Sequence, residues 1–262
     1  MRALTAAQAL VTTSATVCSL SSALLWNLWV LGTPKKVELN YVGSVKPPGK
    51  STRRDYQHYR SAFLPEESVI TVGGARMTSL PRTLIDVTRF HGVTAGVVAM
   101  DSLRASLPRF DRKALEKLLL DGQSYRGKPK VREAIALSTG KSESPLESRA
   151  RVALLTAKVK GLETLEFQKE ITVAPHLFRA DFLINGWLVV EVDGRAKYDG
   201  ATFSQSAEQA IREEREREVH LSRQGFRVLR VHDEDIDNPA RLVALVEREL
   251  SSLASPKPAR PA

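Results

Sequence analysis

Cysteine is almost absent from this 262-residue chain, in which Cys18 is the single example. One cysteine excludes an internal disulfide, and so low a cysteine content is typical of a protein from a reducing cytoplasm. The five histidines have no metal-ligand spacing, and the sequence contains no Cys/His zinc pattern, no Walker-type glycine-rich loop and no Gly-x-Ser-x-Gly element. These absences argue against a zinc-ribbon protein, a P-loop nucleotidase and a serine hydrolase of the α/β type.

The sequence also lacks a long uninterrupted apolar run. Residues 15–31 come nearest to one, but they include three serines, a threonine and an asparagine, and the run is at the short limit for a membrane span. A secretory signal peptide would need a cleaner apolar core and a small-residue cleavage site. We therefore predict a buried helix in a cytoplasmic protein, with a membrane anchor as the alternative.

Acidic residues are outnumbered, 30 Asp and Glu against 39 Lys and Arg, which gives a net charge of +9. A basic protein gains affinity for nucleic-acid phosphates, although charge alone does not identify the partner. Between Tyr41 and Arg60 the positive charges alternate with tyrosines, as they do in loops that face nucleic acid, and a solvated loop fits the pattern equally well. The candidate contacts in this loop are Lys46, Lys50, Arg53, Arg54 and Arg60.

The most informative stretch of the sequence is residues 179–198. It predicts a short strand, a turn at Asn185-Gly186, and a nearly all-apolar strand that ends in Glu191 and Asp193, with Lys197 four residues later. Carboxylates on so apolar a strand are costly to bury unless a partner, usually a metal ion, compensates their charge. The pattern suits metal-assisted phosphodiester hydrolysis, in which carboxylates hold Mg²⁺ or Mn²⁺ and a cation assists the attacking water or the phosphate.

The flanking sequence predicts the elements of an α/β domain. Ser144 is a good helix N-cap, with Pro145 in the first turn and Glu147 three residues after the cap. Beyond this helix, strands and helices are expected around residues 165–173, 179–184, 187–193, 207–224, 226–232 and 238–250. The predicted order is a helix, a three-strand meander, a helix, a strand and a helix, which is enough for a compact domain.

These elements and their motifs resemble the restriction-endonuclease-like PD-(D/E)XK superfamily and, more narrowly, the family related to the very-short-patch mismatch repair endonuclease. The resemblance covers residues 144–250 and is carried by Glu147, Arg179-Ala-Asp181-Phe, Glu191-Val-Asp193-Gly, Arg195-Ala-Lys197-Tyr, residues 214–218 with Leu221, and residues 225–230. It implies that Asp181 and Glu191 bind the divalent metal and that Glu147 is an auxiliary ligand.

The sequence departs from the superfamily pattern at one position. The lysine expected two residues after Glu191 is Asp193 here, which makes Asp193 a candidate extra ligand and Lys197 the candidate source of the missing cation. Arg217 is a further candidate for nucleic-acid contact, although the alternating charges around it are also typical of an exposed helix face. Glu147, likewise, has a simpler interpretation as the capping partner of Ser144.

Hairpin geometry sets a condition on the metal site. An ideal two-residue turn at Asn185-Gly186 places Ile184 opposite Trp187, and therefore Asp181 opposite Val190. Asp181 and Glu191 would then point to opposite faces of the sheet. A shared site requires a one-residue shift in register, from a longer loop or from a β-bulge, and we predict that shift.

The first half of the chain predicts a smaller α+β domain over residues 1–120, followed by a connector and linker over 121–142, the nuclease-like domain over 143–254 and a disordered tail over 255–262. Residues 16–105 resemble the region of AbiEi-type antitoxins that follows their winged helix. Three segments carry this resemblance: Ser19–Trp26, Thr78–Asp86 and Val98–Ser102. The winged helix itself is expected to be missing, as a late start codon would explain.

Two hypotheses from different classes follow. The first is a bacterial-type, Mg²⁺-dependent DNA endonuclease or nicking enzyme, a hydrolase acting on phosphodiester bonds in defence or DNA repair. Its catalytic set would be Glu147, Asp181, Glu191, Asp193 and Lys197. The second is a non-catalytic, antitoxin-like or transcriptional regulator that uses the nuclease fold to bind nucleic acid or a cognate toxin.

Overall fold

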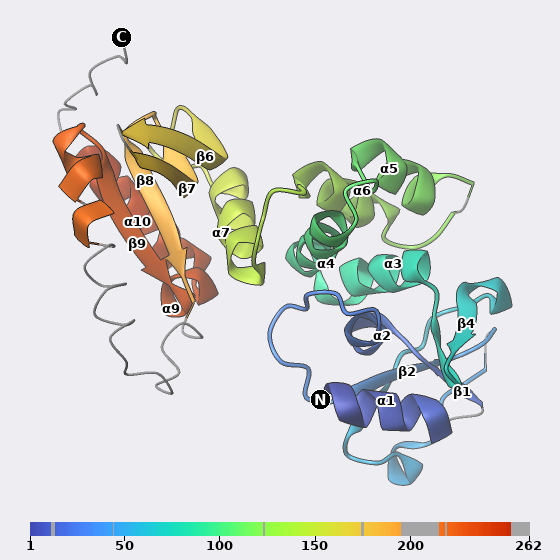
Figure 1. Ribbon diagram of the computed structural model, residues 1–262. Coiled ribbons are helices and arrows are strands. Elements are labelled where there is room, and N and C mark those ends of the chain that lie inside the picture. The colour runs from blue at the N-terminus through green and yellow to red at the C-terminus, as the bar shows by residue number, and fades with distance from the viewer. Residues whose placement is uncertain are drawn as a thin grey trace. The chain divides into compact units, whose positions relative to one another are not determined.

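The computed structural model describes residues 1–11, 14–43, 45–122, 124–173, 176–194, 215–217 and 219–252. The chain divides into two units, Met1–Ser148 and Arg149–Ala262, and each contains one mixed sheet with its own helices (Figure 1). The predicted α/β class is therefore confirmed.

The first unit is built around a five-stranded sheet. Its strands follow the order β3-β2-β1-β5-β4, with β1 antiparallel to β2, β1 parallel to β5, and β2 parallel to β3. The antiparallel hairpin of β4 and β5 closes through Gly73 and Gly74, which both have the positive φ that glycine adopts without strain. In chain order the strands are Ala15–Val17, Val37–Tyr41, Gln57–Tyr59, Val69–Val72 and Ala75–Thr78.

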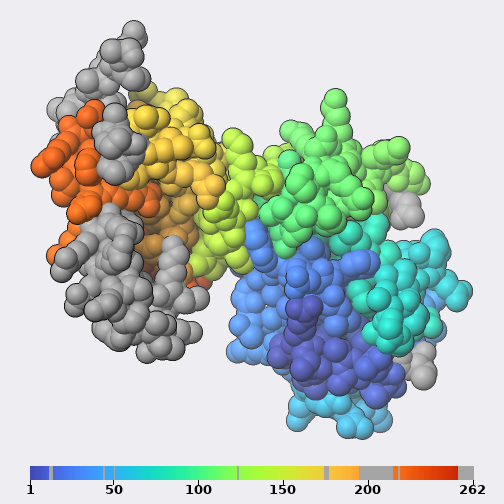
Figure 2. Space-filling view, viewed as in Figure 1, coloured from blue at the N-terminus to red at the C-terminus, as the bar shows by residue number. Residues whose placement is uncertain are grey.

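In the described part of the first unit, α1 and α2 pack against this sheet, and the other helices pack mainly against one another. The helices are α1 Arg2–Val11, α2 Ser19–Leu25, α3 Leu80–His91, α4 Val93–Ser106, α5 Arg112–Leu120 and α6 Lys128–Leu137. Two short 3₁₀ turns cover Lys50–Thr52 and Glu66–Ser68. Helix α3 packs against α2 and α4, and α6 packs against both α3 and α4. In the space-filling view the blue residues of the N-terminal segment lie against the teal and green residues of the later helices (Figure 2).

The predicted buried helix at residues 15–31 is only partly correct. Residues 15–17 form strand β1, and the helix that follows covers Ser19–Leu25. Small and apolar side chains of both elements are buried. Strand β1 is the central strand of the sheet, and α2 packs between the sheet and α3. None of the helices within the described ranges has the length and apolar character that a membrane crossing requires.

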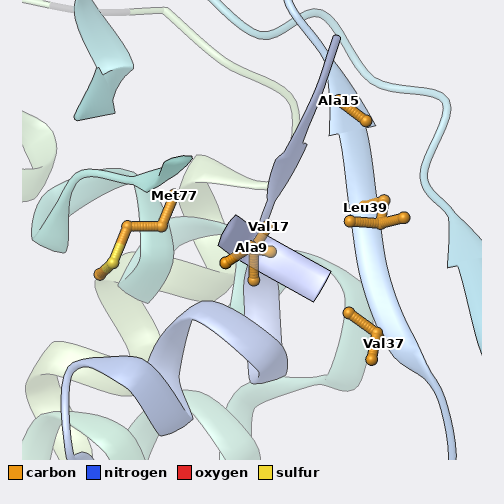
Figure 3. Packing of buried hydrophobic residues seen from close by; sticks show 6 residues of the cluster. All are labelled: Ala9, Ala15, Val17, Val37, Leu39 and Met77. Atoms are coloured by element: carbon orange, nitrogen blue, oxygen red, sulfur yellow. The ribbon is translucent and has the colours of Figure 1, made fainter. Parts of the chain in front are cut away.

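One buried cluster of the first unit lies between α1 and the central strands. Ala9 of α1 lies beside Val17 of β1, and the cluster also includes Ala15 of β1 and three residues on β2 and β5 (Figure 3). The strand members face one side because residues two apart on a strand share a face. This cluster consists of Ala9, Ala15, Val17, Val37, Leu39 and Met77.

The second unit is a four-stranded sheet with helices. Strands β6, β7 and β8 form the predicted antiparallel meander, and β9 pairs in parallel with β8 (Figure 1). Residues 215–217 and 219–223 are helical, and the rest of the predicted 207–224 helix lies outside the described residues. Helix α7, Pro145–Thr156, contains the division between the units after Ser148, and the other elements are β6 Leu165–Val173, β7 His176–Ile184, β8 Leu188–Asp193, β9 Arg227–His232, α9 Asp233–Asp237 and α10 Pro239–Ser251.

One face of the second sheet is covered by the helical segment before β9. Leu183 and Val189 lie directly opposite each other on β7 and β8, and both pack in a buried cluster with Leu221 of that segment. The cluster anchors the helical segment above the middle of the sheet. It therefore also fixes what lies beside the carboxyl end of β8, which carries the candidate site.

Candidate functional site

The turn between β7 and β8 decides which residues share a face. Asn185 and Gly186 both have positive φ, and the Trp187 N–H donates to the Ile184 carbonyl at 3.1 Å, so the predicted two-residue turn is present. Nevertheless Ile184 pairs with Leu188 rather than with Trp187. Trp187 is thus an extra residue, a β-bulge, and the predicted one-residue shift in register is confirmed.

The shifted register brings the two main candidate ligands to one face. Phe182 pairs with Val190, and one further step along the same register places Asp181 opposite Glu191. Residues opposite each other in an antiparallel pair carry their side chains on the same face. Beyond this last pair the Val192 N–H donates to Asp181 Oδ2 at 2.8 Å. The Asp181 carboxylate is therefore held against the backbone of β8.

A second strand fixes the other oxygen of Asp181. Gln168 of β6 donates its side-chain Nε2 to Asp181 Oδ1 at 3.1 Å. Gln168 has φ +48°, a left-handed conformation that a non-glycine residue rarely adopts in a strand. With both of its oxygens bonded, the Asp181 carboxylate has a defined orientation.

Glu191 is held by a cation of the helical segment. Arg217 Nη2 lies 2.6 Å from Glu191 Oε1 and also donates to the Arg179 carbonyl at 3.4 Å. The guanidinium carbon is 5.8 Å from the centre of the Phe178 ring. The Glu191 side chain is 14% exposed, so this ion pair is largely removed from water. Arg217 was predicted to contact nucleic acid or solvent, and in this structure its partner is the candidate ligand.

Asp193, which replaces the expected lysine, also has an arginine partner. Arg230 Nη1 of β9 lies 3.1 Å from Asp193 Oδ2. The parallel pairing of β8 with β9 explains the contact. It pairs Arg230 with Glu191, which is two residues before Asp193 on β8. The Asp193 carboxylate is therefore paired with a guanidinium from the neighbouring strand.

Glu147 occupies the first turn of α7 and makes the contacts of a helix cap. Its backbone N–H donates to Ser144 Oγ at 3.1 Å, and its Oε2 accepts from the Glu143 N–H at 2.9 Å. The predicted capping role is confirmed. The Glu147 side chain accepts from the N–H of Glu143, the residue before the cap, rather than from that of Ser144 itself. The division between the units falls after Ser148, so Glu147 belongs to the first unit. Its role as a metal ligand stays a prediction.

The remaining predicted residue, Lys197, lies outside the described residues. Within the described ranges no group of three or more His, Cys, Asp or Glu side chains is arranged to hold a metal ion. The described site thus consists of the carboxylates Asp181 and Glu191, with Arg217 paired to Glu191 and Arg230 paired to the neighbouring Asp193.

Comparison with protein-family models, curated proteins and solved structures finds no match to this chain. A functional assignment therefore depends on the geometry of the site itself.

The basic loop of the first unit is held largely by its own aromatic residues. Arg53 donates to the Pro48 carbonyl at 2.8 Å, and its guanidinium lies 5.5 Å from the centre of the Tyr59 ring, which stacks on Tyr41. Arg54 is exposed. The loop thus combines an arginine fixed on an aromatic ring with one that faces solvent.

The other three predicted contacts of this loop differ in setting. Lys46 is exposed. Lys50 begins a 3₁₀ turn, and its side chain lies outside the described part of the structure. Arg60 forms an ion pair with the buried Glu38 and covers the Phe90 ring at 4.7 Å. Contact of these residues with nucleic acid stays a prediction, and Arg60 has a structural role as well.

The sequence did not identify Gln168 or Arg230 as members of the site. Apolar alternation on β6 marks Leu165, Phe167 and Ile171, and Gln168 falls among polar residues that it does not distinguish. Its left-handed backbone and its bond to Asp181 become visible only in the folded sheet. Arg230 is one of several arginines near its strand, and only the pairing of β8 with β9 selects it.

Proposed function

We propose that the second unit is a metal-dependent DNA endonuclease or nicking enzyme that hydrolyses phosphodiester bonds. One observation supports the proposal: the extra residue Trp187 shifts the register so that Phe182 pairs with Val190, and continuing that register brings Asp181 to Glu191 at the end of an otherwise apolar strand. Bulges are frequent next to active sites, where they direct a side chain. The left-handed Gln168 beside Asp181 supports the same interpretation, because backbone strain clusters at functional sites.

The side chains at this position suit a hard divalent cation. Mg²⁺ and Mn²⁺ prefer oxygen donors, and Mg²⁺ usually takes one or two protein carboxylates and fills its other positions with water and substrate phosphate. Asp181 and Glu191 would hold it. When bound, it would supply a more acidic water and charge stabilisation at the phosphate.

The arginines would act on the substrate. Glu191 must release the Arg217 guanidinium before its Oε1 can coordinate a cation, which leaves Arg217 available for a DNA phosphate. Arg230 stays protonated, so it can neutralise a phosphate but cannot serve as a base. Lys197 remains the proposed additional cation.

Cleavage of supercoiled plasmid and of single-stranded DNA tests this proposal. With Mg²⁺ or Mn²⁺ the wild-type chain should nick or cut DNA, and EDTA should abolish the activity. Asp181→Ala should lose at least about 100-fold, because even changes around a metal ligand cost up to that factor. Glu170→Ala, which removes an exposed carboxylate from β6, should leave cleavage unchanged. Equal activity in wild type and Asp181→Ala would refute the proposal.

The second candidate function is a non-catalytic regulator that binds nucleic acid or a cognate toxin. It is favoured by the ion pairs of Glu191 with Arg217 and of Asp193 with Arg230, since each carboxylate already has a cation in the folded chain. Tight binding of DNA or of a toxin, combined with no metal-dependent cleavage, would select this alternative.

A further inference from the structure

The first unit contains a cavity of about 1080 Å³ with a strongly basic wall. Its cations are Arg82 and Arg89 of α3, Arg126 just before α6 and Lys130 of α6, and Glu67 is the acidic residue among the lining residues. A cavity of this volume is at the upper end of the range for small-molecule sites. It is too large for one phosphate ion and has room for a nucleotide.

A buried carboxylate holds the two arginines of α3 in place. Asp86, which is fully buried, accepts from Arg82 Nε at 2.8 Å and from Arg89 Nη1 at 3.1 Å. Arg82 also donates to the Phe63 carbonyl at 2.7 Å. One carboxylate thus orients two guanidiniums and leaves the pair with a net positive charge.

Like charges are crowded at this wall. Burial lowers the pKa of the Arg89 guanidinium; Asp86 raises it, whereas Arg82 and Arg126 lower it further. Arg126 and Lys130 are exposed, and neither forms an ion pair with any residue that the structure describes. A bound anion would relieve this repulsion.

Aromatic side chains line the same cavity. Phe90 is already covered by Arg60 at 4.7 Å and by Arg89 at 5.2 Å. Phe63, in contrast, is 64% exposed, so its ring is open to a ligand in the cavity that it lines. A flat nucleobase can stack on such a ring. The cavity therefore offers a cationic part and an aromatic part together.

We propose that this cavity binds a nucleotide with two or more adjacent phosphate groups. The phosphates lie against Arg89, Arg126 and Lys130, and the base lies against Phe63. The proposal concerns the first unit alone and does not depend on nuclease activity in the second.

Calorimetric titration of the full-length chain in EDTA tests this site, since EDTA removes any metal from the second unit. The probes are adenosine triphosphate, pyrophosphate, inorganic phosphate and a single-stranded ten-nucleotide DNA. Adenosine triphosphate should bind one per chain, and inorganic phosphate at least about tenfold more weakly, because it reaches fewer of the cations. The double variant Arg126→Ala/Lys130→Ala should weaken triphosphate binding about tenfold or more.

A matched control separates the site from general charge effects. Lys113→Ala/Lys117→Ala removes two exposed cations from α5, outside the cavity, and should change the affinity less than about twofold. Phe63→Ala should weaken binding of adenosine triphosphate but not of pyrophosphate. The five substituted side chains are all exposed, so these variants should still fold, and circular dichroism checks this. They are Lys113, Lys117, Arg126, Lys130 and Phe63.

Several results would overturn the proposal. These are no saturable binding of adenosine triphosphate, equal losses in the two double variants, or equal effects of Phe63→Ala on triphosphate and pyrophosphate. Binding of the oligonucleotide without binding of the free nucleotide would also overturn it and would assign the wall to a nucleic-acid backbone.

Discussion

Gln168 and Asp181 lie opposite each other on β6 and β7, joined by a 3.1 Å hydrogen bond from the Gln168 amide to Asp181 Oδ1. The flanking pairs, Phe167 with Phe182 and Lys169 with Ala180, keep one register, so the distortion at Gln168 is confined to a single residue. A left-handed non-glycine residue costs roughly 1 to 2 kcal/mol. The sheet therefore retains local strain at the residue that orients the candidate metal ligand.

Substitution of Gln168 should separate strain from function. Both Gln168→Ala and Gln168→Gly lose the bond to Asp181, but only glycine adopts φ +48° without strain. We expect Gln168→Gly to be more stable than Gln168→Ala by about 1 kcal/mol, and both to cleave DNA more slowly than wild type. Hydrogen exchange of the β7 and β8 amides measures the stability difference. Equal stability of the two variants would contradict the strain.

Removal of Arg217 should change metal affinity in an unusual direction. Its guanidinium is 2.6 Å from Glu191 Oε1, so a divalent cation must compete with it for the carboxylate. Arg217→Ala should therefore bind Mn²⁺ several-fold more tightly than wild type, as followed by the electron paramagnetic resonance signal of free Mn²⁺. Arg223→Ala, an exposed arginine of the same helical segment, is the control and should leave affinity unchanged. Weaker Mn²⁺ binding in Arg217→Ala would count against the site.

Glu38 is an internal anion in the first unit. It lies on β2 with 5% exposure, accepts from the Leu20 N–H at 2.9 Å, forms an ion pair with Arg60, and has His91 Nε2 3.0 Å from its Oε1. Burial acts to raise the pKa of Glu38, but His91 and Arg60 outweigh it and lower the pKa from 4.5 to about 2. A lowered carboxyl pKa stabilises the fold above the unfolded-state pKa, and this contribution is lost as pH falls.

Glu38→Gln should accordingly destabilise the chain in a pH-dependent way. At pH 7 the charge-dependent part of the loss is of the order of 3 kcal/mol, from a pKa change of about 2.5. Wild type loses this contribution between about pH 4.5 and pH 2, so the gap between the two proteins should narrow there. Urea unfolding at several pH values measures it, with the exposed Glu66→Gln as control. A gap that stays constant down to pH 2 would show that Glu38 is not held as an anion.

DNA affinity should fall steeply with salt if the basic loop touches the phosphate backbone. Lys46 and Arg54 are the exposed cations whose loss leaves the Arg53–Tyr59 contact intact. Lys46→Ala/Arg54→Ala should reduce the slope of log affinity against log salt by roughly 2, one for each lost phosphate contact. Fluorescence anisotropy with labelled DNA gives the slope. An unchanged slope would mean that the loop is only solvated.

Local pattern in the sequence was enough to predict most elements of the fold. The Ser144 cap, the alternation along β6 and the Asn185-Gly186 turn are all present in the structure. Each depends on residues within a few positions of one another, where backbone sterics and short-range hydrogen bonds decide the outcome. The same reasoning predicted that a shared site needs a shift in register.

Contacts between distant segments decided the rest. The sequence left open how the register would shift, and the bulge at Trp187 supplies the shift, with pairing to β9 fixing its carbonyl. Glu191 meets Arg217 and Asp193 meets Arg230 across 26 and 37 residues. Periodicity states which residues of one strand share a face, but not which charge from another element will be buried beside them. That choice depends on how the whole domain packs, so tertiary structure alone made it.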